Sequence, residues 1–94
     1  MNKFTTDGEK LFINGEHVVK GWESFTGWYW FATEADHIQD SVINGKVHED
    51  DQIWFGLVQG HEDEWGCFSQ AEIESLGNRT WPIKAVDLLH AGRR

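Results

Sequence analysis

Apolar residues concentrate in two runs, residues 28–34 and residues 53–59, which combine aromatic and β-branched side chains. Such runs favour strands, because bulky rings fit a pleated surface better than a helix. In the first run both alternating faces are apolar near the start, so this strand is expected to be central and covered on both sides. Gly56 interrupts the second run, which predicts that a ring or a backbone segment approaches closely there.

An Asn-Gly pair marks the first tight turn that the pattern predicts. Asn14-Gly15 separates two apolar runs within residues 10–20, and both central residues of a type I′ turn need positive φ. We therefore expect a hairpin over this segment, followed by a turn or loop over residues 21–27.

The stretch between the two aromatic runs, residues 35–52, is polar and contains a second Asn-Gly pair at Asn44-Gly45. We expect a long acidic connection here, with a short strand or a turn of helix within it. Connections of this length in small domains often carry function. Beyond the second aromatic run, residues 60–64 are expected to form a hairpin turn whose return strand begins at Trp65.

One helix has clear local signals. Ser69 can cap its N-terminus, and Glu72 three residues later completes a capping box. Phe68, just before the cap, can pack on Ile73 as a hydrophobic staple. These signals predict a helix over residues 70–76, which is so short that it depends on packing against the sheet.

The helix is expected to end where Gly77 or Asn78 adopts a left-handed conformation. Pro82 then suits the beginning of a last strand, because proline cannot donate to the interior of a sheet ladder. The pattern of residues 83–89 favours that strand, and a helical turn over residues 85–90 is the alternative.

Together these elements predict an α+β fold, a small mostly antiparallel sheet with one short helix packed on it. The 94 residues form a single domain, since a second core would not fit. Aromatic residues make up 14% of the chain, which supplies enough ring area for a core without disulfides. Cys67 is the only cysteine. With no apolar run long enough for a membrane span and no signal-like start, we expect a cytoplasmic protein.

The negative charge of the chain narrows the classes of partner that it can bind. The net charge is −8, and residues 34–76 alone carry one lysine against eleven acidic residues, a net of −10. Such a field repels phosphate backbones and anionic membranes. We therefore expect no direct nucleic-acid binding and no membrane binding, and we favour a protein partner with a basic surface. The alternative is that the acids only keep a tryptophan-rich domain in solution.

The acidic residues form three clusters near predicted strand ends and turns, where carboxylates face solvent. If the clusters share one face, they can attract a basic groove by electrostatic steering and complementarity. Trp65 at the predicted hairpin would make an exposed anchor beside them. The candidate partner-binding residues are Glu34, Asp36, Asp40, Glu49, Asp50, Asp51, Glu62, Asp63, Glu64 and Trp65.

Catalytic and metal sites are not expected. His48 and His61 each precede carboxylates, but neither segment matches a zinc-protease helix or a calcium loop. Adjacent residues of a strand also point to opposite faces, so their side chains cannot bind the same metal ion. Cys67 lies between Gly66 and Phe68, where a cysteine usually behaves as a small hydrophobe and not as a nucleophile paired with His61. We therefore expect no catalytic residue, no metal and no cofactor.

The six tryptophans allow another reading, a groove that binds a small ligand. Trp28 and Trp30 are expected to be core residues, whereas Trp65 is expected to be exposed. Under this alternative, Trp54 and Trp65 would contact the ligand.

Four stretches resemble an uncharacterised domain family carried on plasmids and other mobile elements. Residues 28–34 look like its aromatic "WTWYATE"-type strand, and residues 54–62 look like its "FFGLVxGxE" strand and turn. Residues 64–74 look like its "ELGYFSLxELE" turn and helix, and residues 81–83 look like its "LPI" segment. The likeness covers most of the chain from Val18 to Leu88.

The resemblance implies a setting more than an activity, since accessory genes of mobile elements often act on host machinery. Two departures matter. Cys67 stands where the family usually has an aromatic ring, and residues 35–52 are longer and more acidic than the family suggests. A special function of this protein is expected in that stretch.

The sequence therefore favours a small acidic accessory protein that binds a basic protein surface. A nucleic-acid-mimicking inhibitor of host restriction or CRISPR defence is the more specific form of this expectation. A ligand-binding module with an aromatic groove is the alternative.

Overall fold

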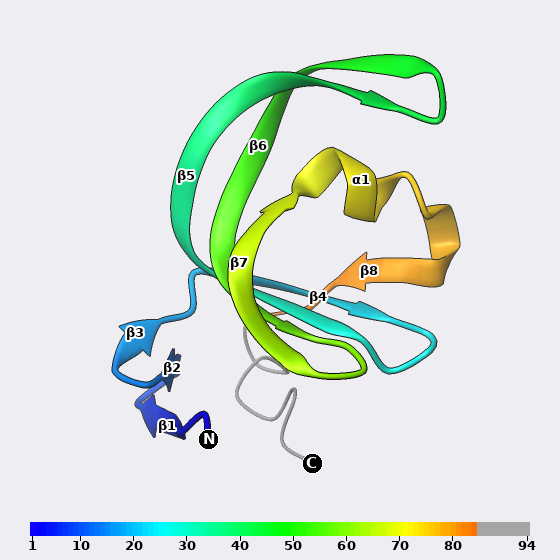
Figure 1. The fold of residues 1–94 in the computed structure, drawn as a ribbon. Coiled ribbons are helices and arrows are strands. Elements are labelled where there is room, and N and C mark those ends of the chain that lie inside the picture. Colours follow the sequence, from blue (N-terminus) through cyan, green and yellow to red (C-terminus); the bar gives the residue numbers. More distant parts are fainter. Residues whose placement is uncertain (85–94) are drawn as a thin grey trace.

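Two long neighbouring strands, β5 (Tyr29–Ile43) and β6 (Lys46–Gln59), organise the fold of a computed structural model that describes residues 1–84 (Figure 1). They lie in a five-stranded antiparallel sheet of order β7-β6-β5-β4-β8, and a second, three-stranded sheet has the order β1-β2-β3. The other elements are β1 (Phe4–Asp7), β2 (Lys10–Ile13), β3 (Glu16–His17), β4 (Lys20–Ser24), β7 (Asp63–Ser69), α1 (Gln70–Glu74), the 3-10 helix η1 (Gly77–Arg79) and β8 (Thr80–Pro82).

The expected antiparallel sheet and single short α-helix are confirmed, but the balance between them differs. Strands make up 64% of the described residues, so the fold is mostly β and not an even α+β mixture. The difference comes mainly from residues 35–52. They continue β5 and β6 as one hairpin, and the expectation of a long loop there is wrong.

Two hydrophobic clusters lie on β5, one against the three-stranded sheet and the other against α1. In the first, Phe31 and Leu57 are fully buried against residues of the three-stranded sheet and its link to β4. In the second, Trp22 and Ala32 pack with Ile73 of α1. β5 is therefore central and covered on both sides in its first half, as its pattern predicts. Fully burying one such side chain contributes about 1.5–3 kcal/mol.

The first hairpin forms where Asn14-Gly15 predicts it, with φ of 52° and 84° at the two residues. Its second strand is short and ends at His17. The turn or loop expected over residues 21–27 is wrong in its first half, because β4 extends to Ser24 and pairs with β5. Trp22, the most buried tryptophan of β4 and β5 with 1% of its surface exposed, fixes β4 in place.

The helix begins at Gln70 as predicted and ends earlier. Only one of the two bonds of the expected capping box forms, since no hydrogen bond within residues 1–84 involves the Glu72 carboxylate. The Ser69 hydroxyl accepts a hydrogen bond from the backbone N–H of Glu72 at 3.0 Å. Ile73 is buried, and Phe68 packs on its cluster. The α-helix ends at Glu74, and the chain continues through η1, in which Gly77 has φ of 65°. Within residues 1–84, no helix is long and apolar enough to cross a membrane.

The last described strand is short. β8 pairs with β4, and Pro82 lies at its end instead of at its beginning. The expected strand or helical turn beyond this point lies largely outside the described residues.

Gly56 of β6 lies so close to the backbone of β5 that no side chain fits at this position. A Cβ added there would lie 1.8 Å from the backbone oxygen of Phe31 and 3.0 Å from the Cα of Ala32. Backbone atoms of a central strand cannot move aside without breaking the ladder. The close approach predicted from a glycine inside a strand is therefore confirmed, and its partner is backbone.

We expect Gly56→Ala to destabilise the fold by about 3 kcal/mol or more, because the new methyl group forces β5 and β6 apart. Urea unfolding followed by tryptophan fluorescence measures the change. Gly66→Ala is the matched control, since Gly66 pairs with Gly56 and a Cβ there meets no atom within 4 Å. Equal stability of the two variants would contradict this reading of the contact.

Candidate functional site

The far half of the β5–β6 hairpin extends beyond the rest of the sheet. β4 pairs with β5 only up to Ala32, and β7 pairs with β6 only from Ile53. Residues 33–52 therefore form a two-stranded ribbon, here called the arm. Its tip is the second Asn-Gly pair, and Asn44 and Gly45 have φ of 52° and 78°, as a tight hairpin turn requires.

The arm is bent and both of its edges are open. Its register shifts at three places, between Ala32 and Glu34, between Ala35 and His37, and between Gln39 and Ser41. Such bulges bend a ribbon and increase its twist. In Figure 1 the arm arches over α1 and leaves the helix on its inner side.

Two of the three acidic clusters lie together on this arm. It carries six acidic residues and Lys46, a net charge of −5. Five of the six carboxylates are exposed, those of Glu34, Asp36, Asp40, Glu49 and Asp50. The backbone N–H of Asp50, which has φ of 54°, donates to the carboxylate of Asp40 at 3.1 Å, and this bond joins the two clusters across the strands.

No lysine or arginine neutralises these carboxylates within residues 1–84. The one ion pair in that part of the chain joins His37 Nδ1 and Asp36 Oδ2 at 2.6 Å. Hydrogen bonds to Gln39 and then to Asp36 raise the pKa of His37 above its ordinary value of 6.5. Within residues 1–84, the arm therefore presents to solvent a negative charge whose only ion-pair partner is His37, at Asp36.

The third cluster lies elsewhere. Glu62, Asp63 and Glu64 are exposed where β6 turns into β7, at the end of β6 opposite the arm (Figure 1). The three clusters therefore do not share one face. Trp65 is half-buried, packs on the first hydrophobic cluster and donates its indole N–H to Asn2 at 2.9 Å, so the expectation that it is exposed is wrong.

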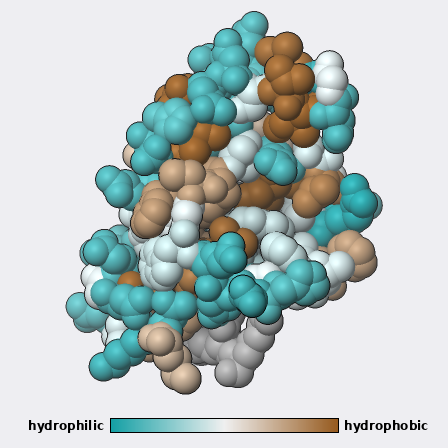
Figure 2. Space-filling view, viewed as in Figure 1, coloured by the Kyte–Doolittle hydropathy of each residue, from teal (hydrophilic) through white to brown (hydrophobic). Residues whose placement is uncertain are grey.

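The arm also exposes apolar side chains that the sequence pattern did not single out. Ile38, Val42 and Val47 are 63%, 71% and 58% exposed, and Val42 lies directly opposite Val47. Figure 2 shows hydrophobic surface near the arm tip, surrounded by hydrophilic surface. Val42 and Val47 thus form one exposed apolar pair, with Ile38 further along the arm and acidic side chains on the same ribbon.

Asp51 is the exception among the arm carboxylates, because only 4% of its surface is exposed. Its Oδ1 accepts from the backbone N–H of Ala71 at 2.9 Å. Its Oδ2 accepts from the hydroxyl of Ser41 at 2.7 Å and from the hydroxyl of Ser69. This carboxylate ties the arm to the start of α1, and it is not part of the exposed surface.

The pKa of Asp51 reflects these contacts. Burial alone would raise it, but the hydrogen bonds from Ser69, Ser41 and Ala71 outweigh burial and hold the pKa below its ordinary value of 3.8. The charged form is therefore the one that the fold stabilises.

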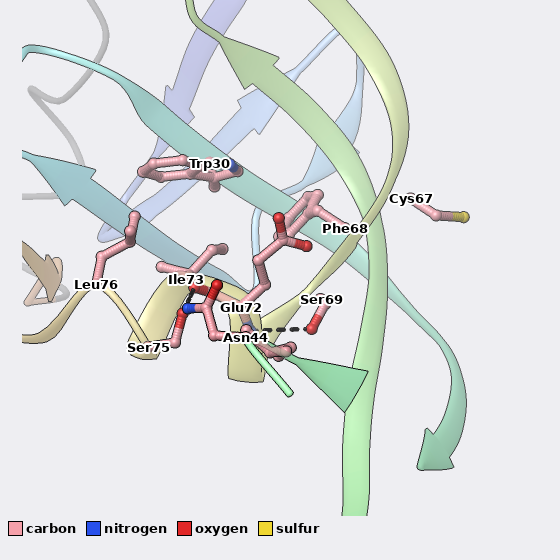
Figure 3. Close-up of a pocket in the computed structure, with 10 residues that line it drawn as sticks. Trp30, Asn44, Cys67, Phe68, Ser69, Glu72, Ile73, Ser75 and Leu76 are labelled. Carbon is pink, nitrogen blue, oxygen red and sulfur yellow. Dashed lines mark hydrogen bonds between the residues drawn. The ribbon is translucent and has the colours of Figure 1, made fainter. Parts of the chain in front are cut away.

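A cleft of about 340 Å³ lies between the arm tip and α1. Trp30 and Phe68 contribute rings to it, and Glu72 contributes a carboxylate (Figure 3). The complete lining is Trp30, Ile43, Asn44, Cys67, Phe68, Ser69, Glu72, Ile73, Ser75 and Leu76. Trp30 is half-buried and not a full core residue, which leaves part of it available to the cleft.

Neither a nucleophile nor a metal centre is assembled in the described residues. Cys67 is exposed, contrary to the expected small buried hydrophobe, and its sulfur points away from the cleft in Figure 3. The His61 ring packs on Trp28 at 5.5 Å between centroids. Across residues 1–84, no three His, Cys, Asp or Glu side chains are grouped as metal ligands would be.

No protein-family model, curated protein or solved structure matches the chain.

We expect Asp51→Asn to destabilise the fold by about 1–3 kcal/mol near neutral pH, because α1 and the arm lose the charged carboxylate that accepts their hydrogen bonds. Because the pKa of Asp51 is lower in the folded state, its contribution is present above pH 3.8 and disappears as the pH falls through the folded value. Thermal unfolding from about pH 6 to pH 3 should therefore show the two proteins converging in stability.

Glu49→Gln serves as the control for this comparison, because Glu49 is an exposed arm carboxylate on the same strand. It should follow the wild-type pH profile. A constant stability gap between Asp51→Asn and the wild type across the acid range would show that the charge of Asp51 is not what matters.

Proposed function

We propose that this protein binds a protein partner with a basic surface and that the arm is the binding element. The observation that carries the proposal is the set of five exposed arm carboxylates with no lysine or arginine partner within residues 1–84. Complementary charge accelerates encounter with a basic partner and rejects acidic ones.

The exposed apolar side chains of the arm support direct packing against a partner, in addition to long-range electrostatic attraction. Charge alone gives little affinity in water, because exposed ion pairs contribute about 0–1 kcal/mol each. Ile38, Val42 and Val47 offer apolar area that a partner can cover, and their acidic neighbours supply the polar rim of such an interface.

Mimicry of nucleic acid is a narrower form of this proposal. The ten residues from 34 to 43 span roughly 33 Å of strand, and five exposed carboxylates over that length give one charge per roughly 7 Å. Duplex DNA carries one charge per about 1.7 Å of axis. The spacing on the arm is close to every second phosphate of one strand, at about 3.4 Å per phosphate. On this proposal the arm imitates a short, sparsely charged part of one strand, and an inhibitor of restriction or CRISPR complexes would use it against a limited basic patch.

The proposal includes a cytoplasmic setting and an accessory role on a mobile element, which rests on the sequence resemblance. An exposed, unpaired Cys67 suits a reducing compartment. In the ligand-binding alternative, Trp54 and Trp65 would offer only their ring faces, since their indole N–H groups donate to Gln70 and Asn2 within the fold.

We expect Glu34→Lys/Glu49→Lys to weaken partner binding about tenfold or more, because two attractive charges become repulsive. Affinity capture with mass spectrometry identifies the partner, and titration calorimetry then measures Kd. Asp50 and Asp51 are left unchanged, since positive φ at one and burial of the other would confound the result with misfolding.

Glu62→Lys/Glu64→Lys is the control with the same change in net charge at the third cluster, and it should bind nearly as the wild type does. Raising salt from about 0.05 to 0.5 M should weaken binding, because screening shortens the range of the attraction. Equal loss in both variants, or binding indifferent to salt, would remove the arm from the interface.

A further inference from the structure

The cleft beneath the arm tip combines aromatic faces with one acidic group. Trp30 and Phe68 present their rings, and Ile43, Ile73 and Leu76 complete an apolar wall. In Figure 3 the carboxylate of Glu72 points toward the space beside Trp30 and Phe68. A volume of about 340 Å³ accommodates one amino-acid side chain, at the lower end of the usual range for ligand sites.

The carboxylate of Glu72 is unpaired among the described residues. Its backbone N–H donates to Ser69, and its backbone carbonyl accepts from the Ser75 hydroxyl at 2.6 Å. No hydrogen bond or ion pair within residues 1–84 involves its side-chain oxygens. Glu72 is an exposed residue and lines the same cleft as Trp30 and Phe68, so its carboxylate is accessible to a cation that enters beside the two rings.

An organic cation matches both features of the cleft. Aromatic faces attract cations through the ring quadrupole, and a carboxylate completes the charge. A planar guanidinium fits better than an ammonium, because it can stack on a ring while its N–H groups bind both carboxylate oxygens.

We propose that the cleft binds an arginine side chain of the basic partner, stacked against Trp30 and paired with Glu72. This inference rests on the proposed function. It is continuous with the arm, because Ile43 and Asn44 belong to the arm and also line the cleft. The arm then attracts the basic surface, and the cleft selects one residue on it.

A neighbouring cavity, lined by residues of the β4–β5 turn and by the chain after α1, limits the site to one cation. It has a volume of about 250 Å³, shares Trp30 and Leu76 with the cleft and contains Phe25, which is 68% exposed. Arg79 also lines it. A second positive charge is therefore disfavoured there, and an apolar residue next to the arginine fits.

The test uses Nα-acetyl-arginine methylamide as the probe and observes the tryptophan indole N–H signals by NMR. The wild type should bind it weakly, with shifts largest at Trp30. Glu72→Gln should weaken binding about tenfold, because a charged hydrogen-bonded partner is removed. Gln preserves the backbone N–H that caps the helix, so the fold is expected to persist, which circular dichroism checks.

Glu74→Gln is the matched control, since Glu74 is an exposed carboxylate of the same helix that does not line the cleft. It should bind as the wild type does. The neutral isostere Nα-acetyl-citrulline methylamide should not bind. Equal binding of citrulline, an unchanged affinity in Glu72→Gln, or tighter binding of the lysine analogue would overturn the arginine assignment.

The two proposals fail separately. If the arginine probe does not bind but the captured partner still depends on Glu34 and Glu49, the cleft inference fails and the arm function stands. If the probe binds to the cleft but no basic partner depends on the arm, the proposed function fails, and the inference of a partner arginine falls with it in favour of a free small cation.

Discussion

The buried carboxylate of Asp51 is the contact on which the upper half of the molecule depends. It joins Ser41 of β5, Ser69 at the end of β7 and the N–H of Ala71 in α1. A helix of five residues has no independent stability in water, and this anchor positions it beneath the arm. Because the Asp51 carboxylate bonds to both the arm and α1, it fixes the position of α1 relative to the arm. The cleft lies between these two elements.

Local chemistry made several features of the fold predictable. Asn14-Gly15 needs positive φ at both residues, Gly56 excludes a side chain, and Ser69 accepts the helix N–H of Glu72. Each depends on atoms within a few residues or on backbone alone. The arm was missed because its faces are solvated, so residues 35–52 lack the apolar alternation that identifies a half-buried strand. The Asn44-Gly45 pair was the available signal for it.

The candidate site was predictable in kind but not in arrangement. Sequence clustering singled out Asp40 and Asp50 without pairing them, and the β5–β6 register brings these two together. It could not separate Asp51, which a bulged register turns inward. Trp30 and Glu72 meet only because β5 and α1 pack in three dimensions, so no spacing in the sequence marks the pair. The exposure of Val42 and the partial burial of Trp65 likewise depend on where the neighbouring strands end.

The open edges of the arm could pair with the same edges of another copy of this chain. Unpaired backbone N–H and C=O groups along an exposed ribbon are a template onto which another molecule can add a strand. Three bulges break the straight path that such addition needs, and like-charged carboxylates repel an identical ribbon. The acidity of the arm therefore disfavours strand addition between copies of this chain. On the proposed function, the carboxylates that would face a basic partner are thus the same ones that oppose edge-to-edge stacking of identical chains.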